Sequence, residues 1–151
     1  AYDDHGGMQF RENLKEDTVL LDIGACAALL RRTNNRVAIS GFCTGGTWAW
    51  IAANRLDFDA SVIFYGSDIH DSLDQKPNCP TLLHYGDADH VVPFELVQRI
   101  SESFSDSEFH VYPGAGHAFY NPEQTNHDAE AARLAHRRSV EFLEKHFVKD
   151  G

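Results

Sequence analysis

Short strand-like segments alternate with helical segments along the chain, and this alternation limits the possible folds more than any other feature. Apolar strands, each followed by a glycine or a Pro-Gly pair, are predicted at 36–40, 60–65, 81–85 and 108–112. Helices are predicted over 10–32, 44–56, 93–104 and 125–147, with a polar loop at 67–78. Strands and helices in this order, joined by short loops, predict a mainly parallel sheet flanked by helices on both faces. We therefore expect a single α/β domain over residues 1–151.

The overall composition is that of an ordinary globular protein, and its charge argues against two classes of partner. Of the residues, 42% are hydrophobic and 24% are charged. The formal net charge of −10 disfavours nucleic acid and anionic membranes, because phosphate binding needs a basic surface. No apolar run approaches the roughly 20 residues of a membrane span, and the first residues lack the basic and apolar regions of a signal peptide. We expect a cytoplasmic protein without membrane association.

The chain has three cysteines, Cys26, Cys43 and Cys79, and they form neither an even framework nor a CxxC pair. This pattern favours a reducing compartment in which the thiols stay free. Cys26 falls on the apolar helix predicted over 10–32, so we expect it to be a small buried hydrophobe. Neither Cys26 nor Cys79 needs a functional role.

The turn after the first predicted strand has the spacing of a nucleophile elbow. Residues 41–46 read G-F-C-T-G-G, which is G-x-C-x-G with cysteine in the nucleophile position. In such an elbow the nucleophile lies on a strained strand-to-helix turn, and the glycines two before and two after it remove side chains that would clash. Cys43 would then lie at a helix N-terminus, which favours its thiolate, and the N–H of Thr44 would donate into an oxyanion hole. The competing interpretation is a buried structural cysteine beside packing glycines.

Acidic and basic partners for such a nucleophile follow two other predicted strands. Residues 86–93 read G-D-A-D-H-V-V-P, in which Asp87 and Asp89 compete for the role of orienting carboxylate. Asp87 suits a turn, so Asp89 is preferred on its position in the motif. His117 follows the last strand in a glycine-rich loop, where an acid–base histidine is expected. The order Cys43, Asp89, His117 is that of α/β-hydrolases, and differs from the orders of chymotrypsin-like and subtilisin-like enzymes.

Four short blocks together resemble the dienelactone hydrolase family, the carboxymethylenebutenolidases. They are G-F-C-T-G-G, F-Y-G, G-D-A-D-H-V-V-P and G-A-G-H-A-F, and the resemblance covers nearly the whole chain. It implies an α/β-hydrolase fold in which Cys43 is the nucleophile, His117 the general base and then acid, and Asp89 its partner. It implies hydrolysis of a small ester, lactone or thioester, with no cofactor and no metal.

The resemblance also implies that the family fold is truncated in this chain. Family members carry first strands, a glutamate that pairs with the cysteine, a substrate-binding arginine and a second oxyanion donor in sequence that precedes the start of this chain. A second arginine of the lactone-specific members lies four residues after the catalytic histidine, where this chain has Asn121. Asn121 argues against an anionic dienelactone as the substrate. The sequence is therefore read either as a natural compact protein or as a piece of a longer one.

Aromatic side chains near the predicted strand ends are candidates for an apolar substrate pocket. Phe42, Tyr65, Phe119 and Tyr120 are expected to line it together with Asn121. Trp48 and Trp50 lie inside the helix after the elbow, where core packing is the better interpretation.

Three further expectations remain open at this stage. A catalytically impaired module that binds a ligand or partner is the alternative to an enzyme. A metal site from His84, Asp89, His90 and His117 is disfavoured, because no motif with metal-ligand spacing is present. Without the neighbouring strand that the family fold implies, the strand at 36–40 would be an exposed sheet edge, so the chain is expected to form a homodimer or swap elements there, or to be a piece of a longer protein.

Overall fold

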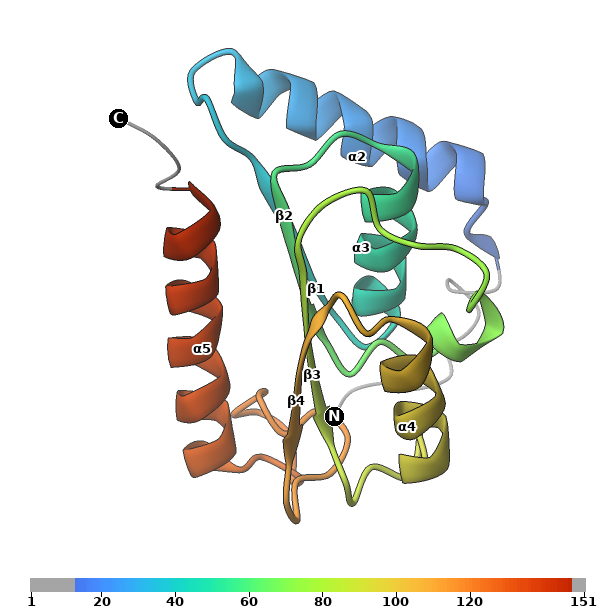
Figure 1. Cartoon of the computed structure of the whole chain (residues 1–151), viewed down its shortest axis with the longest axis vertical. Helices are drawn as coiled ribbons and strands as arrows, with labels where there is room; N and C mark the ends of the chain where they lie inside the picture. The colour runs from blue at the N-terminus through green and yellow to red at the C-terminus, as the bar shows by residue number, and fades with distance from the viewer. Residues whose placement is uncertain (1–12, 148–151) are drawn as a thin grey trace.

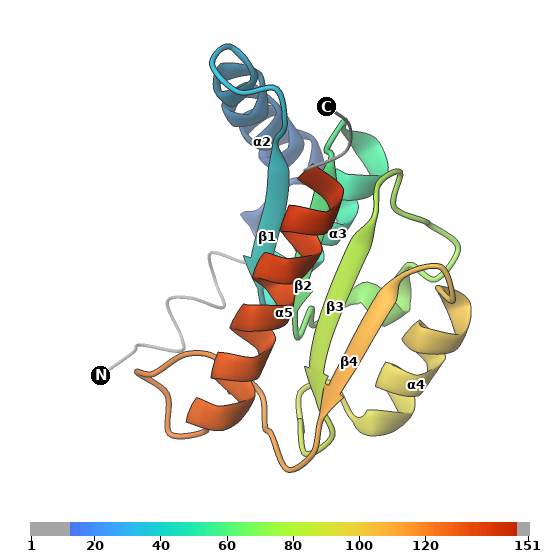
Figure 2. The ribbon, with the colours of Figure 1, turned by 60° about the vertical axis from the view of Figure 1, so that its left-hand side comes forward.

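Four parallel strands form one sheet in the computed structural model, which describes residues 13–147 (Figure 1). The strands are β1 (Ala38–Phe42), β2 (Ala60–Phe64), β3 (Thr81–Gly86) and β4 (Glu108–Tyr112). They lie in the order β1-β2-β3-β4, and each neighbouring pair is parallel. The carboxyl ends of all the strands therefore meet at one edge of the sheet, where the arrowheads lie in Figure 2.

Helices cover both faces of this sheet. They are α2 (Glu16–Arg31), α3 (Thr44–Arg55), α4 (Phe94–Ser103) and α5 (Ala129–Phe147), with a short 3-10 helix η1 (Ile69–Asp71). Figure 1 shows α3 and α4 on one face and α5 on the other, while α2 packs beside α3. The predicted class, an α/β fold with a parallel sheet flanked by helices, is confirmed.

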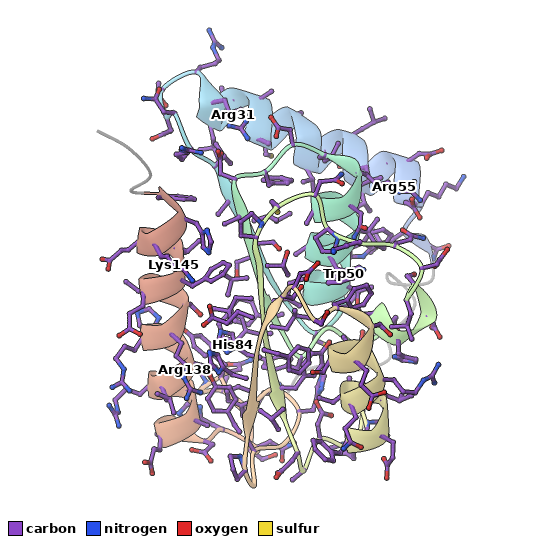
Figure 3. All side chains as sticks on the ribbon, viewed as in Figure 1. Arg31, Trp50, Arg55, His84, Arg138 and Lys145 are labelled. Atoms are coloured by element: carbon purple, nitrogen blue, oxygen red, sulfur yellow. The ribbon has the colours of Figure 1, made fainter. Side chains whose placement is uncertain are left out.

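The hydrophobic core surrounds the two central strands. Every residue of β2 and β3 is buried, whereas β1 and β4 are partly exposed, because helices cover the middle of the sheet most completely. Trp50 and His84 lie on opposite faces of the sheet (Figure 3). Trp50 is fully buried and packs on Phe104 with ring centroids 4.4 Å apart, so its interpretation as a core residue is confirmed. Trp48 is half-buried.

Several element boundaries differ from the sequence-based prediction, and a carboxylate explains the starts of β1 and α5. α2 begins at Glu16, whereas the helix was predicted from residue 10, and residues 10–12 of that prediction lie outside the described residues. β1 begins at Ala38 rather than at residue 36, because Asp59 accepts the N–H of Val37 at 2.8 Å and pairs with Arg36 at 3.0 Å. β1 also continues through Gly41, which was expected to end it. α5 begins at Ala129 rather than at residue 125, because Asp128 accepts the N–H groups of Glu130 and Ala131 and so caps the helix.

The outer face of α2 contradicts one expectation. Cys26 is exposed, not buried. Leu21 and Leu29 are 74% and 62% exposed, and Ala27 is the buried residue of the helix. Helical periodicity was therefore right about the helix but did not show which of its faces is covered. Between residues 13 and 147, no helix is both long and apolar enough to cross a membrane.

Candidate active site

Cys43 lies at the turn between β1 and α3, at the N-terminus of α3. Its φ of 53° is in the left-handed region that residues other than glycine rarely adopt. A non-glycine residue keeps such a conformation only where the surrounding structure enforces it, as at a strained nucleophile turn. The Cys43 N–H donates to the carbonyl of Phe64, at the end of β2, at 3.0 Å, which anchors the turn to the neighbouring strand.

Two of the glycines around Cys43 lie so close to neighbouring backbone that a side chain would clash, but they are not the two that the motif predicts. A Cβ atom on Gly41 would lie 1.9 Å from the carbonyl oxygen of Gly45, so only glycine fits there. A Cβ atom on Gly45 would meet no atom within 4 Å. The second tight position is Gly46, where a Cβ would lie 3.0 Å from the carbonyl oxygen of Phe64. The expectation that a side chain at Gly45 would clash is therefore wrong.

Cys43, His117 and Asp89 form a continuous hydrogen-bonded chain at the carboxyl edge of the sheet. The Sγ of Cys43 is 3.0 Å from the Nε2 of His117, and the Nδ1 of His117 is 2.8 Å from the Oδ2 of Asp89. The other carboxylate oxygen of Asp89 accepts the N–H groups of Val91 and Val92 at 2.7 and 2.9 Å. Because the Asp89 carboxylate is fully buried, these contacts fix its orientation.

The competing carboxylate, Asp87, lies outside this chain of contacts. Its Oδ1 accepts the N–H of Gly114 at 2.6 Å, which ties the loop after β3 to the turn after β4. Asp87 thus has the turn role considered for it, and Asp89 is the carboxylate that meets the histidine.

The protonation states in the chain are mutually dependent. Burial raises the pKa of the Cys43 thiol, but the hydrogen bond and charge of His117, with the N–H and hydroxyl of Thr44, outweigh it and leave a lowered pKa. Burial lowers the pKa of His117, but its hydrogen bonds to Asp89 and Cys43 and their negative charges raise it to about 9. The pKa of Asp89 is lowered: burial opposes this, and the hydrogen bonds from His117, Val92 and Val91 prevail. Together these shifts favour a thiolate–imidazolium pair.

Thr44 is placed as the motif suggests. It is the first residue of α3, and its backbone N–H helps to lower the pKa of the Cys43 thiol. The Thr44 hydroxyl lies 4.0 Å from the same sulfur. An N–H in the first turn of a helix, next to the nucleophile in the sequence, can donate to a carbonyl oxygen that becomes negative during attack.

A cavity of about 720 Å³ opens directly above Cys43. The residues predicted from the sequence that line it are Phe42, Tyr65, Tyr120 and Asn121, beside Cys43 and His117. Phe119 is a correction, because it is fully buried in the core against Tyr65 and Tyr112. The left-handed backbone at Ala118, with φ 62°, accompanies this change of side between His117 and Phe119.

The four residues weighed as a metal site do not form one cluster, because His84 is separate from the contact between Asp89 and His117. His84 lies in the core, where its ring nitrogens are 2.9 Å from the Tyr112 hydroxyl and 3.0 Å from the Ser139 hydroxyl. Across residues 13–147, no group of three or more histidine, cysteine, aspartate or glutamate side chains is arranged to hold a metal ion.

Comparison with known proteins identifies the family. The model of the dienelactone hydrolase family matches residues 4–147. The chain belongs to the dienelactone hydrolase family. Among curated relatives of this family member, the carboxymethylenebutenolidase of Pseudomonas putida is 34% identical over 116 residues, and carboxymethylenebutenolidase 1 of Cupriavidus pinatubonensis is 33% identical over 122 residues. These alignments cover 74% and 78% of this chain, but 49% and 52% of the relatives, so the chain spans about half their length.

Solved structures agree with this family assignment. A candidate dienelactone hydrolase from Klebsiella pneumoniae is similar with a TM-score of 0.76 and 26% identity, over 89% of this chain and 63% of the other. Esterase 2 of Thermogutta terrifontis shares the fold, with a TM-score of 0.71 and 20% identity over 92% of this chain and 68% of the other.

The sequence-based prediction missed several residues that line the cavity beside Cys43. His90, Val91, Ala118, Pro122, Gln124 and Asn126 line it as well. Two features of the sequence point to them: His90 and Val91 directly follow Asp89, and the others lie close to His117 in the loop that leads to α5. The sequence-based prediction looked for aromatic side chains and, apart from Asn121, did not consider the other residues of these loops.

Proposed function

We propose that this protein hydrolyses a small ester, lactone or thioester, with Cys43 as the nucleophile, His117 as the acid–base group and Asp89 as its orienting partner. The observation that carries the proposal is the contact of 3.0 Å between Cys43 Sγ and His117 Nε2, on a histidine held by the buried carboxylate. Family membership supports the reaction class, because curated relatives are carboxymethylenebutenolidases.

Acylation is the first half of the proposed reaction. The Cys43 thiolate attacks the carbonyl carbon, and the Thr44 N–H donates to the oxygen that becomes negative. When the tetrahedral intermediate collapses, the bond to the leaving oxygen, or to the leaving sulfur of a thioester, breaks and the His117 imidazolium gives that atom its Nε2 proton. This half leaves an acyl-cysteine and a neutral His117. It releases an alcohol from an ester or a thiol from a thioester, whereas the new hydroxyl of a lactone stays attached to the acyl chain.

Deacylation returns the site to its starting state. Neutral His117 takes a proton from water, and the oxygen of that water attacks the acyl carbon. The carbon–sulfur bond then breaks, which releases the carboxylic acid and restores the thiolate beside the imidazolium. Asp89 keeps its charge throughout and stabilises the imidazolium in each half. Phe42, Tyr65, Tyr120 and Asn121 contact the substrate in this proposal.

Replacement of Cys43 tests the proposal, and a second cysteine supplies the control. Cys43→Ala should reduce the enzyme-catalysed hydrolysis of 4-nitrophenyl acetate by at least about a hundredfold, since it removes the thiolate that would form the acyl intermediate. Cys79→Ala removes a half-buried thiol outside the cavity and should keep the wild-type rate. Undiminished turnover by a folded Cys43→Ala variant would rule out the nucleophilic role.

We also propose that β1 pairs with β1 of a second copy of this chain. In the part of the chain that the structure describes, the outer edge of β1 has no partner strand, and an unpaired edge readily recruits another strand. Exposed leucines on α2 would gain cover in such a dimer. Light scattering should give a dimer for the wild type and for Ser40→Ala, but a monomer for Ser40→Pro, which disrupts edge pairing. A wild-type monomer at every concentration would contradict the pairing.

A further inference from the structure

Tyr65, the residue that follows β2, has a backbone conformation that a bulky residue rarely adopts. Its φ is 40°, in the left-handed region. Within residues 13–147, two other residues apart from glycine have a positive φ, Cys43 and Ala118. Cys43 forms the elbow, and Ala118 directly follows His117. Strained backbone of this kind persists where the surrounding structure enforces it and is common at active sites, so the conformation of Tyr65 indicates a role in the site.

Hydrogen bonds to β3 hold Tyr65 in this conformation. The N–H of Tyr65 donates to the carbonyl of His84 at 2.8 Å. The carbonyl of the next residue, Gly66, accepts the hydroxyl of Tyr85 at 3.0 Å, and Tyr85 is fully buried. Strand β3 therefore fixes the turn that carries Tyr65, and with it the place of the Tyr65 side chain.

The ring of Tyr65 packs against the ring of His117. The two ring centroids are 5.1 Å apart and the ring planes are inclined by 61°, which is an edge-to-face arrangement. The Tyr65 ring also packs on Phe119, with centroids 5.5 Å apart and planes inclined by 69°. Phe119 is fully buried and Tyr65 is 2% exposed. The imidazole of His117 therefore rests on a ring that is itself part of the core.

This ring contact restrains a motion of His117 that its hydrogen bonds do not. Asp89 holds Nδ1 and Cys43 holds Nε2, at 2.8 and 3.0 Å, which sets the directions of the two nitrogens. These bonds only weakly resist tilting of the imidazole about the line between the two nitrogens, because such a tilt changes their lengths little. A packed ring beside the imidazole resists the tilt directly, because close-packed atoms cannot overlap.

Tyr65 acts on His117 as a neutral ring. Burial raises the pKa of Tyr65, and nearby negative charges, that of Cys43 first, raise it further. The phenol therefore stays uncharged over the pH range in which Cys43 becomes a thiolate. Tyr65 adds no charge to the ion pair, so its effect on His117 comes through contact.

We infer that Tyr65 is a positioning residue for His117: its ring, held by the strained turn after β2, keeps the imidazole in line between Cys43 and Asp89. This inference rests on the proposed hydrolase function and adds a residue to the machinery of the same site. The ring supplies the contact, so phenylalanine can replace Tyr65, whereas an aliphatic side chain cannot.

Two substitutions separate the ring of Tyr65 from its hydroxyl. Tyr65→Phe keeps the ring, so kcat for 4-nitrophenyl acetate should stay within about threefold of the wild type. Tyr65→Leu removes the ring, and kcat should fall about tenfold or more, because His117 is then poorly placed to move a proton. A tenfold fall in Tyr65→Phe would assign the role to the hydroxyl and overturn the inference.

The pH dependence of Cys43 alkylation is a readout that lost packing alone would not move. When His117 is displaced in Tyr65→Leu, it lowers the pKa of Cys43 less. The midpoint of the pH–rate profile for iodoacetamide should therefore move up by about half a pH unit or more. In Tyr65→Phe the midpoint should stay at the wild-type value.

Phe104→Leu is the matched control, because it removes a buried ring that packs on Trp50. It should lower the free energy of unfolding in urea but leave kcat and the alkylation midpoint at their wild-type values. An unchanged midpoint in folded Tyr65→Leu, or the same shift in Phe104→Leu, would overturn the inference.

The alkylation measurement also separates this inference from the hydrolase proposal, because it needs the pair of Cys43 and His117 but no turnover. Wild-type protein that does not hydrolyse 4-nitrophenyl acetate, with a midpoint that still shifts in Tyr65→Leu, would contradict the hydrolase proposal and support the positioning of His117. Hydrolysis by the wild type, with no shift of the midpoint in Tyr65→Leu, would do the reverse.

Discussion

At the scale of single residues, Asp89 divides its two oxygens between two tasks. One oxygen accepts from His117, and the other accepts from the N–H groups of Val91 and Val92. The Asn side chain in Asp89→Asn has one oxygen, which can accept a hydrogen bond either from His117 or from the N–H groups of Val91 and Val92. Its NH₂ group would then face the other partner, which also needs an acceptor, so the Nδ1–H tautomer of His117 is no longer held. We expect kcat for 4-nitrophenyl acetate to fall by about 10³–10⁴, the size of loss seen when a triad carboxylate becomes an amide.

Asp87 provides the control for this substitution. Asp87→Asn keeps an oxygen that can accept the Gly114 N–H. Because Asp87 does not contact the triad, kcat should stay within about threefold of the wild type. Equal losses in the two variants would assign the effect to the loop and not to the triad.

The reactivity of Cys43 towards iodoacetamide should depend on His117. Because the folded-state pKa of Cys43 is lowered, its thiolate persists as the pH falls through the range in which ordinary thiols take up a proton. Alkylation of Cys43, followed by peptide mass mapping, should therefore stay fast below that range. In His117→Ala the histidine no longer offsets the effect of burial, so the pKa of Cys43 should rise. The rate of alkylation of Cys43 at pH 7 should then drop about tenfold or more.

Cys79 provides the internal comparison for this labelling. Burial raises the pKa of its thiol, so it should label slowly in both proteins. Rapid labelling of Cys43 in His117→Ala would contradict the ion pair.

At the scale of elements, the turn from β1 into α3 is the tightest part of the site. Gly41→Ala would place a Cβ 1.9 Å from the Gly45 oxygen, so the turn must open, and we expect a loss of about 3 kcal/mol or more in the free energy of unfolding. Gly45→Ala has open space around the new Cβ and lies in the first turn of α3, so it should be neutral or stabilise by about 0.5–1 kcal/mol. Urea unfolding of the two variants measures this difference. Similar losses would mean that the elbow is not held as described.

Elements were predictable from the sequence because local periodicity specifies them, whereas their ends depend on distant side chains. β4 was predicted to the residue, since its apolar pattern is bounded by local turn residues. The start of β1 depends on Asp59, which lies 22 residues beyond Val37, and no local pattern reveals that contact. Likewise, the apolar pattern predicts the helix that carries Cys26, but it does not tell which face of that helix the rest of the protein covers.

The site was predictable to the extent that strand ends determine it. Cys43, Asp89 and His117 each follow a strand of one parallel sheet, so topology alone brings them to the same edge. Phe119 was misplaced because the left-handed turn at Ala118 is invisible in an aromatic pattern. The cavity residues that were missed belong to loops whose path depends on tertiary contacts.

At the scale of the whole molecule, buried His84 links the sheet to α5 and makes stability depend on pH. The Ser139 hydroxyl donates to the Ala135 carbonyl at 2.8 Å, so its oxygen accepts from Nε2–H of His84, and the Tyr112 hydroxyl donates to Nδ1. Figure 3 shows His84 on the side of the sheet that faces α5, near Arg138. Burial, with the charges of His110 and Arg138, lowers the pKa of His84 to about 3.

This lowered pKa predicts acid destabilisation. Below pH of about 6.5 the unfolded chain protonates this histidine and the folded protein does not, so stability that is complete above that pH is lost as the pH falls. Between pH 7 and pH 5 the loss from His84 should be about 2 kcal/mol in the free energy of unfolding. Urea unfolding at both pH values should show a smaller loss in His84→Gln than in the wild type. The same loss in both proteins would exclude His84 as the cause.

The central claim is that Cys43 carries the acyl group during turnover. Rapid acid quenching of the protein with 4-nitrophenyl acetate, followed by digestion and mass spectrometry, reports which side chain is acylated. The account predicts an acetyl group on the peptide that contains Cys43, present in the wild type during turnover and accumulating in Asp89→Asn if deacylation slows more than acylation. Turnover without any acetylated Cys43, or acetylation only at Cys26 or Cys79, would contradict it.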